Sequence, residues 1–481
     1  TTWSYSATTG NLTQIANALN QLTQFTSYDG NGRPLAAVDA NGVATTFTYD
    51  WRGQLLTRAI AGQTTRFDYS DTGRLRRVTL GDGSFVDYAY DTAQRLISLT
   101  DNINQQRLYT RDDAGNVTRE ETLNADGTPA RVRNRSFDAL GRLSADIGAA
   151  GQTTGYSYDS HGNLRTVTDA RSTATAPLVT THDHDELNRL TQITDAASPA
   201  GQTRFTYDGL DQLLSVRAPN NATTIYTVDG LGNVTQEVSP DRGSTTYTHD
   251  AAGNVRTRTD ARGITATYSY DALNRLTGIT YPTPGENISL TWDSAAGCAN
   301  GVGRLCQVTD AGGTTRHSYD ARGNLIEVVR IELGQTYTSA YTYTAADRLA
   351  TLGTPTGKTF TVARDALGRV QSLSGSVAGA AAVFVQQLVY RGDGQLAGQR
   401  YGNGLAEATA RDLDGRASGT SASMAGAATE DIPLPPWALA LLAAALLGGL
   451  YRQQARVHGG AEAGRRLLAW AVLIALSSSL T

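Results

Sequence analysis

Hydrophobic and polar positions alternate along this chain in short runs that are separated by turn-forming residues. In the segment ATYSYDALNRLTGIT, Tyr268 and Tyr270 lie two residues apart, so they face the same side of an extended strand. Asp271 to Asn274 then supply turn chemistry, because an Asp side chain bonds the backbone ahead of it and Asn tolerates positive φ. Leu276 opens a second extended segment. Each unit of the pattern therefore predicts a strand, a tight turn and a second strand.

The unit recurs with a period of about 21 residues, as from Asp208 to Asp271 in three equal steps. The Tyr-Asp pair of the turn stands at Tyr49-Asp50, Tyr90-Asp91, Tyr158-Asp159, Tyr207-Asp208, Tyr270-Asp271 and Tyr319-Asp320. Glycine takes the place of Asn274 in other copies, as at Gly141 and Gly323. We expect these turn residues to be structural. A lone hairpin is at best marginally stable in water, so neighbouring copies must pair edge to edge.

The predicted fold class is an all-β repeat, a continuous and strongly twisted antiparallel sheet over residues 20–418. Residues 1–19 are expected to be the N-terminal edge of a truncated repeat array. The chain opens on Thr1 with no basic segment and no apolar run, so no signal peptide is visible. It looks like a piece of a longer product.

The repeated pattern Y-D-x-x-G-R-L resembles the RHS or YD-repeat family over about residues 20–418, and the run Tyr401-Gly402-Asn403-Gly404 is also typical of it. The resemblance implies a sheet that spirals into a large shell. In bacterial relatives the shell encloses a toxic C-terminal domain, and in the distantly related teneurins it is extracellular and serves adhesion. This sequence departs from the toxin pattern, because no proline- and aspartate-rich cleavage core and no variable toxin domain follow the repeats.

The composition changes after Asp414. Residues 419–431 are small and polar, which predicts a flexible linker, and residues 432–481 read as a membrane-anchoring segment. The run 434–451 contains no charge, and its eighteen residues span about 27 Å as a helix, close to the roughly 30 Å hydrocarbon core. Interface anchors bracket this run and basic residues follow it: Trp437, Tyr451, Arg452 and Arg456.

A basic loop, 452–466, precedes a second apolar run, 467–480, which is short for a span. The two runs predict a C-terminal transmembrane helix or a helical hairpin, and a buried helix of a soluble domain is the alternative. The segment loosely resembles bacterial C-terminal sorting signals of the IPTL type. Arginines between the runs should be cytoplasmic. The predicted localisation is therefore the cell envelope with the repeats on the extracytoplasmic side, or secretion.

The two cysteines, Cys298 and Cys306, flank an expanded turn. A disulfide is expected on the external side of a membrane, where closing so small a loop would stabilise by roughly 2–3 kcal/mol. Two reduced thiols are the alternative. The pair His182 and His184 invites a metal hypothesis, but both align with the tyrosines of other copies, which favours a packing role.

Catalysis and nucleic-acid binding find no support in the sequence. No nucleophile elbow, zinc-protease, nucleotide-loop or dinucleotide motif is present, and aspartates that recur once per unit favour a turn device over a catalyst. The net charge is −4, with 45 acidic and 41 basic residues, whereas a phosphate-binding groove needs a basic excess. We expect no enzyme, no catalytic residue, no cofactor and no metal.

Three functions remain open. The first hypothesis is a non-catalytic shell or scaffold held at the bacterial cell envelope, which encloses or contacts another protein. The second is the delivery or encapsulation part of a polymorphic toxin whose effector domain is absent from this sequence. The third is surface adhesion or glycan binding through exposed tyrosines. The partners expected are thus the membrane, an effector protein and possible glycans.

Overall fold

The computed structural model describes residues 1–377 and 379–424, which form one sheet of 38 strands. Every strand pairs antiparallel with the strand that precedes it and the one that follows it, as β24 does with β23 and β25. The single helical element of the described residues is a short 3-10 turn, Pro284–Glu286. The predicted all-β fold, a continuous antiparallel sheet, is confirmed.

The first winding of the sheet, defined here as β1 to β23, consists of β1 (Thr2–Tyr5), β2 (Leu12–Ala16), β3 (Leu22–Tyr28), β4 (Pro34–Val38), β5 (Ala44–Tyr49), β6 (Leu55–Ile60), β7 (Gln63–Tyr69), β8 (Leu75–Thr79), β9 (Phe85–Tyr90), β10 (Leu96–Asp101), β11 (Gln106–Arg111), β12 (Val117–Leu123), β13 (Pro129–Phe137), β14 (Leu143–Gly148), β15 (Thr153–Tyr158), β16 (Leu164–Thr168), β17 (Val179–His184), β18 (Leu190–Thr194), β19 (Gln202–Tyr207), β20 (Leu213–Arg217), β21 (Thr223–Val228), β22 (Val234–Ser239) and β23 (Gly243–His249).

The second winding consists of β24 (Val255–Thr259), β25 (Thr265–Tyr270), β26 (Leu276–Thr280), β27 (Ile288–Trp292), β28 (Leu305–Asp310), β29 (Gly313–Tyr319), β30 (Leu325–Glu332), β31 (Gln335–Tyr343), β32 (Leu349–Gly353), β33 (Thr359–Arg364), β34 (Val370–Val377), β35 (Ala380–Tyr390), β36 (Leu396–Tyr401), β37 (Leu405–Arg411) and β38 (Ala417–Met424).

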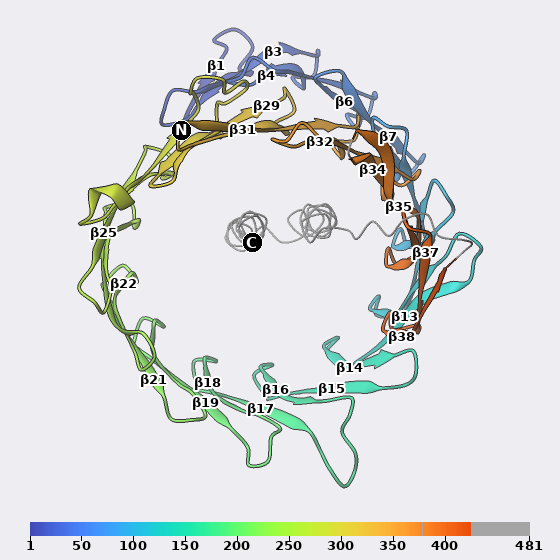
Figure 1. Cartoon of the computed structure of the whole chain (residues 1–481). Helices are drawn as coiled ribbons and strands as arrows, with labels where there is room; N and C mark the ends of the chain where they lie inside the picture. The colour runs from blue at the N-terminus through green and yellow to red at the C-terminus, as the bar shows by residue number, and fades with distance from the viewer. Residues whose placement is uncertain (378, 425–481) are drawn as a thin grey trace.

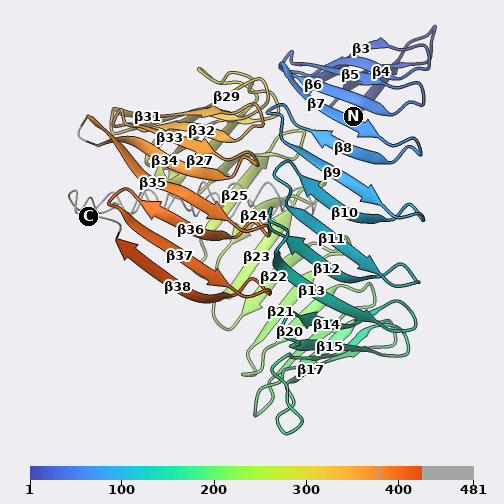
Figure 2. The same cartoon turned by 90° about the vertical axis from the view of Figure 1, so that its right-hand side faces the viewer.

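The sheet curves into a spiral that passes a full turn. Viewed along the spiral axis, the strands follow a ring until β29 to β35 return alongside the first strands (Figure 1). In the perpendicular view, β35 to β38 lie beside β9 to β13 rather than on top of them (Figure 2). The second winding therefore continues beside the first along the axis, so that the two windings meet at their edges.

The two faces of the sheet differ in chemistry because side chains alternate along each strand. On β25, Tyr268 and Tyr270 share one face, where they oppose Ile279 and Leu276 of β26. The other face carries small polar residues such as Ser269, which is exposed. Both clusters of buried apolar side chains in the described residues lie in the second winding: Leu352, Phe360, Val362, Val370, Phe384, Val385 and Leu388.

One expectation about boundaries is wrong. The predicted flexible linker, 419–431, begins inside β38 (Ala417–Met424), which pairs with β37 from Leu405 to Arg411. Small Ser, Ala and Thr side chains suit a linker by composition, but they also fit an edge strand whose backbone hydrogen bonds come from its neighbour. At the other end, residues 1–19 already contain β1 and β2 of the same sheet.

The predicted membrane segment, with Trp437, Tyr451, Arg452 and Arg456, lies outside the described residues. Within residues 1–377 and 379–424, no helix has the length and apolar character needed to cross a bilayer.

Candidate functional site

The sheet has two kinds of turn, one at each edge. Turns that follow an odd-numbered strand carry the Tyr-Asp pattern and are called Tyr-Asp turns here, as at Tyr270-Asp271 between β25 and β26. Turns that follow an even-numbered strand are called return turns, as at residues 39–43 between β4 and β5. Because strands alternate in direction, all Tyr-Asp turns lie on one edge of the sheet and all return turns lie on the other.

Where a Tyr-Asp turn carries the aspartate, its side chain is bonded to the backbone of its own turn. The Oδ1 atom of Asp229 accepts the amides of Leu231 and Asn233, both at 2.9 Å. Hydrogen bonds from the side chain of Asn233 and then from these amides lower the pKa of Asp229. The residue two places before the second strand adopts positive φ, as at Gly141 (75°) and Gly323 (86°). These carboxylates therefore hold turns.

A β-bulge follows each Tyr-Asp turn. Tyr270 pairs with Leu276 but Ser269 pairs with Gly278, so Thr277 is an extra residue in β26. The same register shift recurs at Tyr49, Tyr158 and Tyr319. A bulge bends its strand and increases its twist. The bulge recurs at every Tyr-Asp turn, whereas only two pairs joined by a return turn, β12–β13 and β34–β35, shift register. This imbalance between the two edges gives a consistent physical cause for the curvature of the wall.

The tyrosines of the turns tie each hairpin to the one before. The hydroxyl of Tyr270 donates to the carbonyl of Val255 at 3.0 Å, and that of Tyr158 donates to Leu143 at 2.8 Å. Tyr207 and Tyr319 make the same bond to Leu190 and Leu305. These rings are therefore engaged between hairpins.

An arginine ladder runs along the same edge, and the sequence analysis assigned it no role. The Nε atom of Arg275 donates to Asp271 of its own turn at 2.7 Å. Its guanidinium also reaches the next turn, where it pairs with Asp293 and lies 5.0 Å from the centre of the Trp292 ring. Arg33, Arg142, Arg189 and Arg369 likewise stack on the aromatic residue of the following turn. The sequence signal that could have revealed this ladder is the arginine that recurs directly after the Gly or Asn of the turn.

The windings meet along a seam, defined here as the contact between Tyr-Asp turns of the second winding and return turns of the first. The hydrogen bonds between turns of the two windings join turns that are 23 strands apart, for example β8–β9 with β31–β32. At that point Arg348 pairs with Asp82 at 2.9 Å. Two turns further along, Asn102 donates to the carbonyl of Ala366 at 3.0 Å. The constant spacing shows that one turn of the spiral takes 23 strands.

The end of the described seam includes backbone contacts. The amide of Gly392 donates to Asn124 at 2.7 Å, and the amide of Val132 donates to the carbonyl of Leu413 at 2.9 Å. Gly392 cannot carry a side chain here, because a Cβ atom would lie 2.1 Å from the carbonyl oxygen of Leu123. The seam is thus polar and close-fitting at this point.

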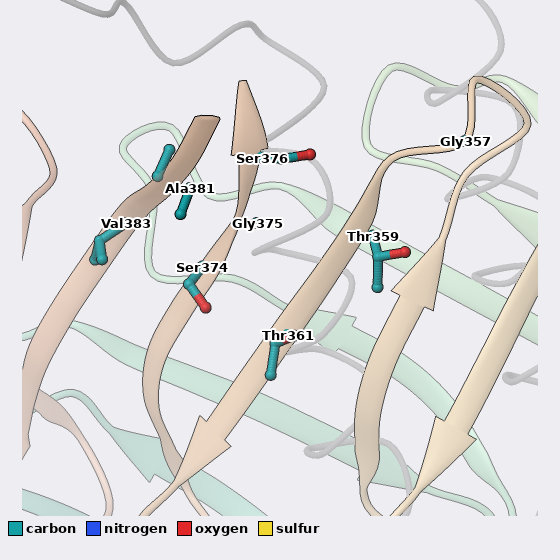
Figure 3. A pocket seen from close by; sticks show the side chains of 9 residues that line it. Gly357, Thr359, Thr361, Ser374, Gly375, Ser376, Ala381 and Val383 are labelled. Carbon is teal, nitrogen blue, oxygen red and sulfur yellow. The ribbon is translucent and has the colours of Figure 1, made fainter. Parts of the chain in front are cut away.

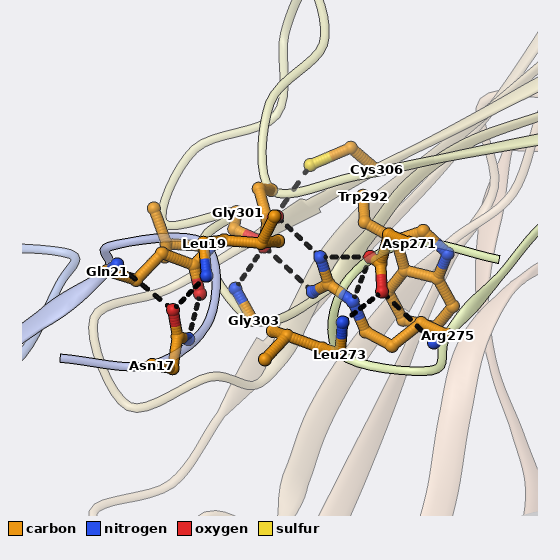
Figure 4. A network of polar contacts seen from close by, with 12 residues as sticks. Asn17, Leu19, Gln21, Asp271, Leu273, Arg275, Trp292, Gly301, Gly303 and Cys306 are labelled. Carbon is orange, nitrogen blue, oxygen red and sulfur yellow. Dashed lines mark hydrogen bonds and ion pairs between the residues drawn. The ribbon is translucent and has the colours of Figure 1, made fainter. Parts of the chain in front are cut away.

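The expanded turn between β27 and β28 also reaches the first winding. A disulfide joins Cys298 and Cys306 across it. Val302, between the cysteines, exchanges two hydrogen bonds with Asn41 of the β4–β5 return turn, at 2.8 and 3.0 Å. Figure 4 shows this loop beside the first return turn, where the side chain of Asn17 donates to that of Gln21 at 2.7 Å.

Asp293 is the polar centre of this expanded turn. It accepts two hydrogen bonds from Arg275, at 2.9 and 2.6 Å, and one from the amide of Gly303 at 2.7 Å. The bonds from Arg275, ahead of the other contacts, lower the pKa of Asp293 to about 2. The carboxylate is charged at neutral pH and fixes the base of the loop.

The third residue of the Tyr-Asp turn distinguishes sealed turns from free ones. In the seam this residue is covered, as for the side chains of Asp393 and Asp414, which are 4% and 12% exposed. On the first winding the equivalent residues are exposed, and four of them are leucines that are 65–84% exposed: Leu140, Leu187, Leu210 and Leu231. The free edge of the first winding therefore carries a row of exposed leucines.

Other candidate features carry no site. His182, like His249 and His317, lies on the tyrosine face and has a buried Nδ1 atom without a partner; burial lowers the pKa of His317. No group of three metal-ligating residues occurs in the part of the chain that the structure describes. A depression of about 440 Å³ over β33 to β35 is lined by small residues, with Thr361 and Ser374 on one side of the strands (Figure 3).

A single-layer wall of hairpins that winds past one turn and seals against its own edge defines a spiral β-shell protein. Two family models match: RHS Repeat over residues 137–174, 184–224, 228–265, 249–284 and 300–336, and Teneurin YD-shell over residues 1–113. Together they match more than half of the 481 residues. The chain belongs to the RHS/YD-repeat family.

Curated relatives are bacterial proteins that are much longer. Toxin protein Tse5 of Pseudomonas aeruginosa is 28% identical over 28% of this chain and 10% of its own length. Double-stranded DNA deaminase toxin A of Burkholderia cenocepacia is 28% identical over 28% of this chain and 8% of its own. Probable deoxyribonuclease RhsB of Dickeya dadantii is 33% identical over 26% of this chain and 9% of its own. The chain thus matches about a tenth of each relative.

Solved structures share the fold over most of the chain. A crystal structure of TcdB2-TccC3 has a TM-score of 0.68 at 16% identity and covers 88% of this chain and 27% of that one. The Tc holotoxin pore of Photorhabdus luminescens gives a TM-score of 0.67 at 14% identity, over 88% of this chain and 29% of that one. At these identities the likeness shows the fold alone.

Proposed function

We propose that this chain is part of the wall of a toxin-delivery shell that encloses another polypeptide. The observation that carries the proposal is the seam: the sheet passes a full turn and docks its Tyr-Asp turns on its own return turns every two strands, for example at Arg348 and Asp82. A sheet that only presented a surface would need no such closure. The names of the three relatives, all toxins or a nuclease, agree with a cargo that acts on a target cell.

The row of exposed leucines supports a wall that extends beyond the two windings. Positions equivalent to Leu210 and Leu231 are covered wherever a second winding docks, whereas these two are 69% and 84% exposed. Exposed apolar rows of this kind mark interaction sites. A further winding that brings its return turns to this edge would cover the leucines as the seam covers Asp393.

The proposal assigns no chemistry to the repeats themselves. Its support is that the recurrent carboxylates, such as Asp229, are occupied by the amides of their own turns. The envelope-scaffold hypothesis depends on residues 432–481, which lie outside the described residues, and it stays a prediction. The glycan hypothesis also stays a prediction, and the rings of Tyr158 and Tyr270 offer it no support because their hydroxyls bond neighbouring hairpins.

The test uses the product of the complete reading frame that encodes this chain. The purified native protein is digested with a nonspecific protease and the surviving fragments are identified by mass spectrometry. The proposal predicts a segment without Tyr-Asp repeats that survives in the native protein and is cleaved once the shell is opened by denaturant. A product in which every segment outside the repeats is cleaved at once, or in which no such segment exists, contradicts it.

A further inference from the structure

The turn between β27 and β28 is much longer than the other Tyr-Asp turns. In an ordinary copy the amide of Asp271 bonds the carbonyl of Arg275, four residues on, whereas in this copy the amide of Asp293 bonds the carbonyl of Arg304, eleven residues on. The seven additional residues project from the Tyr-Asp edge. The disulfide joins two cysteines that are eight residues apart and so closes this part of the turn into a loop.

One residue of the loop, Val302, forms hydrogen bonds with the first winding. The amide of Val302 donates to Asn41 Oδ1 at 2.8 Å, and Asn41 Nδ2 donates back to the carbonyl of Val302 at 3.0 Å. The disulfide lies directly beneath this contact, since a Cβ atom on Gly301 would be 2.5 Å from each of the two sulfur atoms. The sulfurs therefore pack on the backbone that presents Val302.

The two sulfur atoms differ in access. Cys306 is 0% exposed, whereas Cys298 is partly exposed. Thiol–disulfide exchange proceeds by attack of a thiolate on one sulfur, and access decides which sulfur is attacked. Because Cys306 is fully buried, an external thiol is expected to attack at Cys298, the more exposed of the two cysteines.

We infer that the Cys298–Cys306 disulfide is a thiol-exchange site that latches the second winding to the first. A thiolate of a dithiol reductant attacks Cys298 Sγ, the S–S bond breaks, and Cys306 leaves and takes up the proton that the attacking thiol gave up. The second thiol of the reductant then displaces Cys298 as a thiol, so the protein gains two electrons and two protons and the reductant becomes a disulfide.

Reduction frees the loop and weakens the contact that it holds. Without the cross-link the residues between the cysteines regain conformational freedom, and the two bonds to Asn41 must then order them again. Disulfides persist in oxidising compartments and are reduced in the cytosol. The latch is therefore closed outside cells and released in a reducing cytoplasm. It acts on the seam whether or not the shell holds a cargo, so its test is independent of the proposed function.

The first measurement is amide hydrogen exchange on the full chain, oxidised and after treatment with dithiothreitol, with the redox state read from the intact mass. The latch predicts exchange about tenfold faster or more after reduction in peptides over 36–44 and 294–304, with no change over 265–280. Glutathione should form its mixed disulfide on Cys298. Three results overturn the inference: a native disulfide that resists reduction, full reduction without faster exchange, or glutathione on Cys306.

A matched pair of variants separates the latch from the turn itself. Asn41 and Asn31 occupy the same place in two Asp-x-Asn-Gly turns, but the Asn31 side chain makes no hydrogen bond in the part of the chain that the structure describes. In the oxidised protein, Asn41→Ala should speed exchange over 294–304 and Asn31→Ala should not. Equal exchange in the two variants contradicts the role of the Val302 contact.

Discussion

The Gly392→Ala variant tests the seam at the point where the windings approach most closely. The added Cβ atom would lie 2.1 Å from the carbonyl oxygen of Leu123, and ordinary contact begins at 3.4 Å. The atoms of Leu123 and Asn124 that the Cβ would meet belong to the backbone, so they cannot rotate away. The two windings must therefore separate by about 1.3 Å, the difference between these distances. The hydrogen bond from the Gly392 amide to Asn124, now 2.7 Å, would then be lost.

The expected cost is local. A buried hydrogen bond that is left unmade costs about 1–3 kcal/mol, which corresponds to roughly a 5- to 150-fold increase in seam opening. Hairpins away from the seam keep their own ladders, because each unit of a repeat array contacts only its neighbours. The amides of Asn124 to Val132 and of residues 390–394 should therefore exchange faster, and those of β19 to β22 should not change.

Gly209→Ala is the matched control. Gly209 follows Asp208 as Gly392 follows Arg391, in the same position of a Tyr-Asp turn, but nothing lies within 4 Å of the place its Cβ would take. Amide exchange followed by mass spectrometry distinguishes the two variants. The reasoning is refuted if Gly392→Ala leaves exchange at the seam unchanged, or if Gly209→Ala produces the same increase.

Three further predictions concern the turns, the expanded loop and the free edge. Tyr270→Phe removes the 3.0 Å bond to Val255 and should destabilise the protein by about 1 kcal/mol in chemical denaturation. Tyr337→Phe, at an exposed residue, should not change the stability. Equal effects of the two variants contradict the role of the Tyr270 hydroxyl. The pKa of Asp293 is lowered from 3.8 to about 2, so its stabilising contribution of about 2 kcal/mol is complete above pH 4 and is lost as the pH falls towards 2. The rate of cleavage of residues 294–304 by an acid protease, normalised to an unfolded peptide, should therefore rise in the wild type as the pH falls from 4 towards 2. In Asp293→Asn this cleavage should already be fast at pH 4. A wild-type rate that does not change with pH argues against the ion pair. In the product of the complete reading frame, Leu210→Cys should resist a maleimide reagent while Ile225→Cys, on the exposed face of β21, reacts; equal labelling is inconsistent with a further winding at this edge.

The repeat unit was predictable because its signals are local. Asp229 and Asn233 act within four residues of each other, and alternation places Tyr268 and Tyr270 on one face without knowledge of the rest of the chain. The single antiparallel sheet then follows, because consecutive hairpins pair edge to edge. The same reasoning misjudged β38, because composition alone does not distinguish a linker from an edge strand.

The seam was not predictable from one sequence. Its partners are 261 to 281 residues apart, and the residues that meet, such as Arg348 with Asp82, have no motif in common. The number of strands in a turn depends on small twists accumulated at each bulge, which no single repeat reveals. Cys298 and Cys306 drew attention by their spacing, but the contact between Val302 and Asn41 that gives the loop its role required the structure.

The central claim is that the sheet returns to its own edge after 23 strands. The most direct test is a pulsed electron–electron distance measurement between spin labels in the β10–β11 and β33–β34 turns, at Asn102→Cys and Ala366→Cys, with Cys298 and Cys306 kept in their disulfide. One narrow, short distance is expected, because the two turns lie against each other in the seam, where the bond from Arg369 to Gln105 at 3.3 Å remains in the labelled protein. A broad distribution centred on long distances would contradict it.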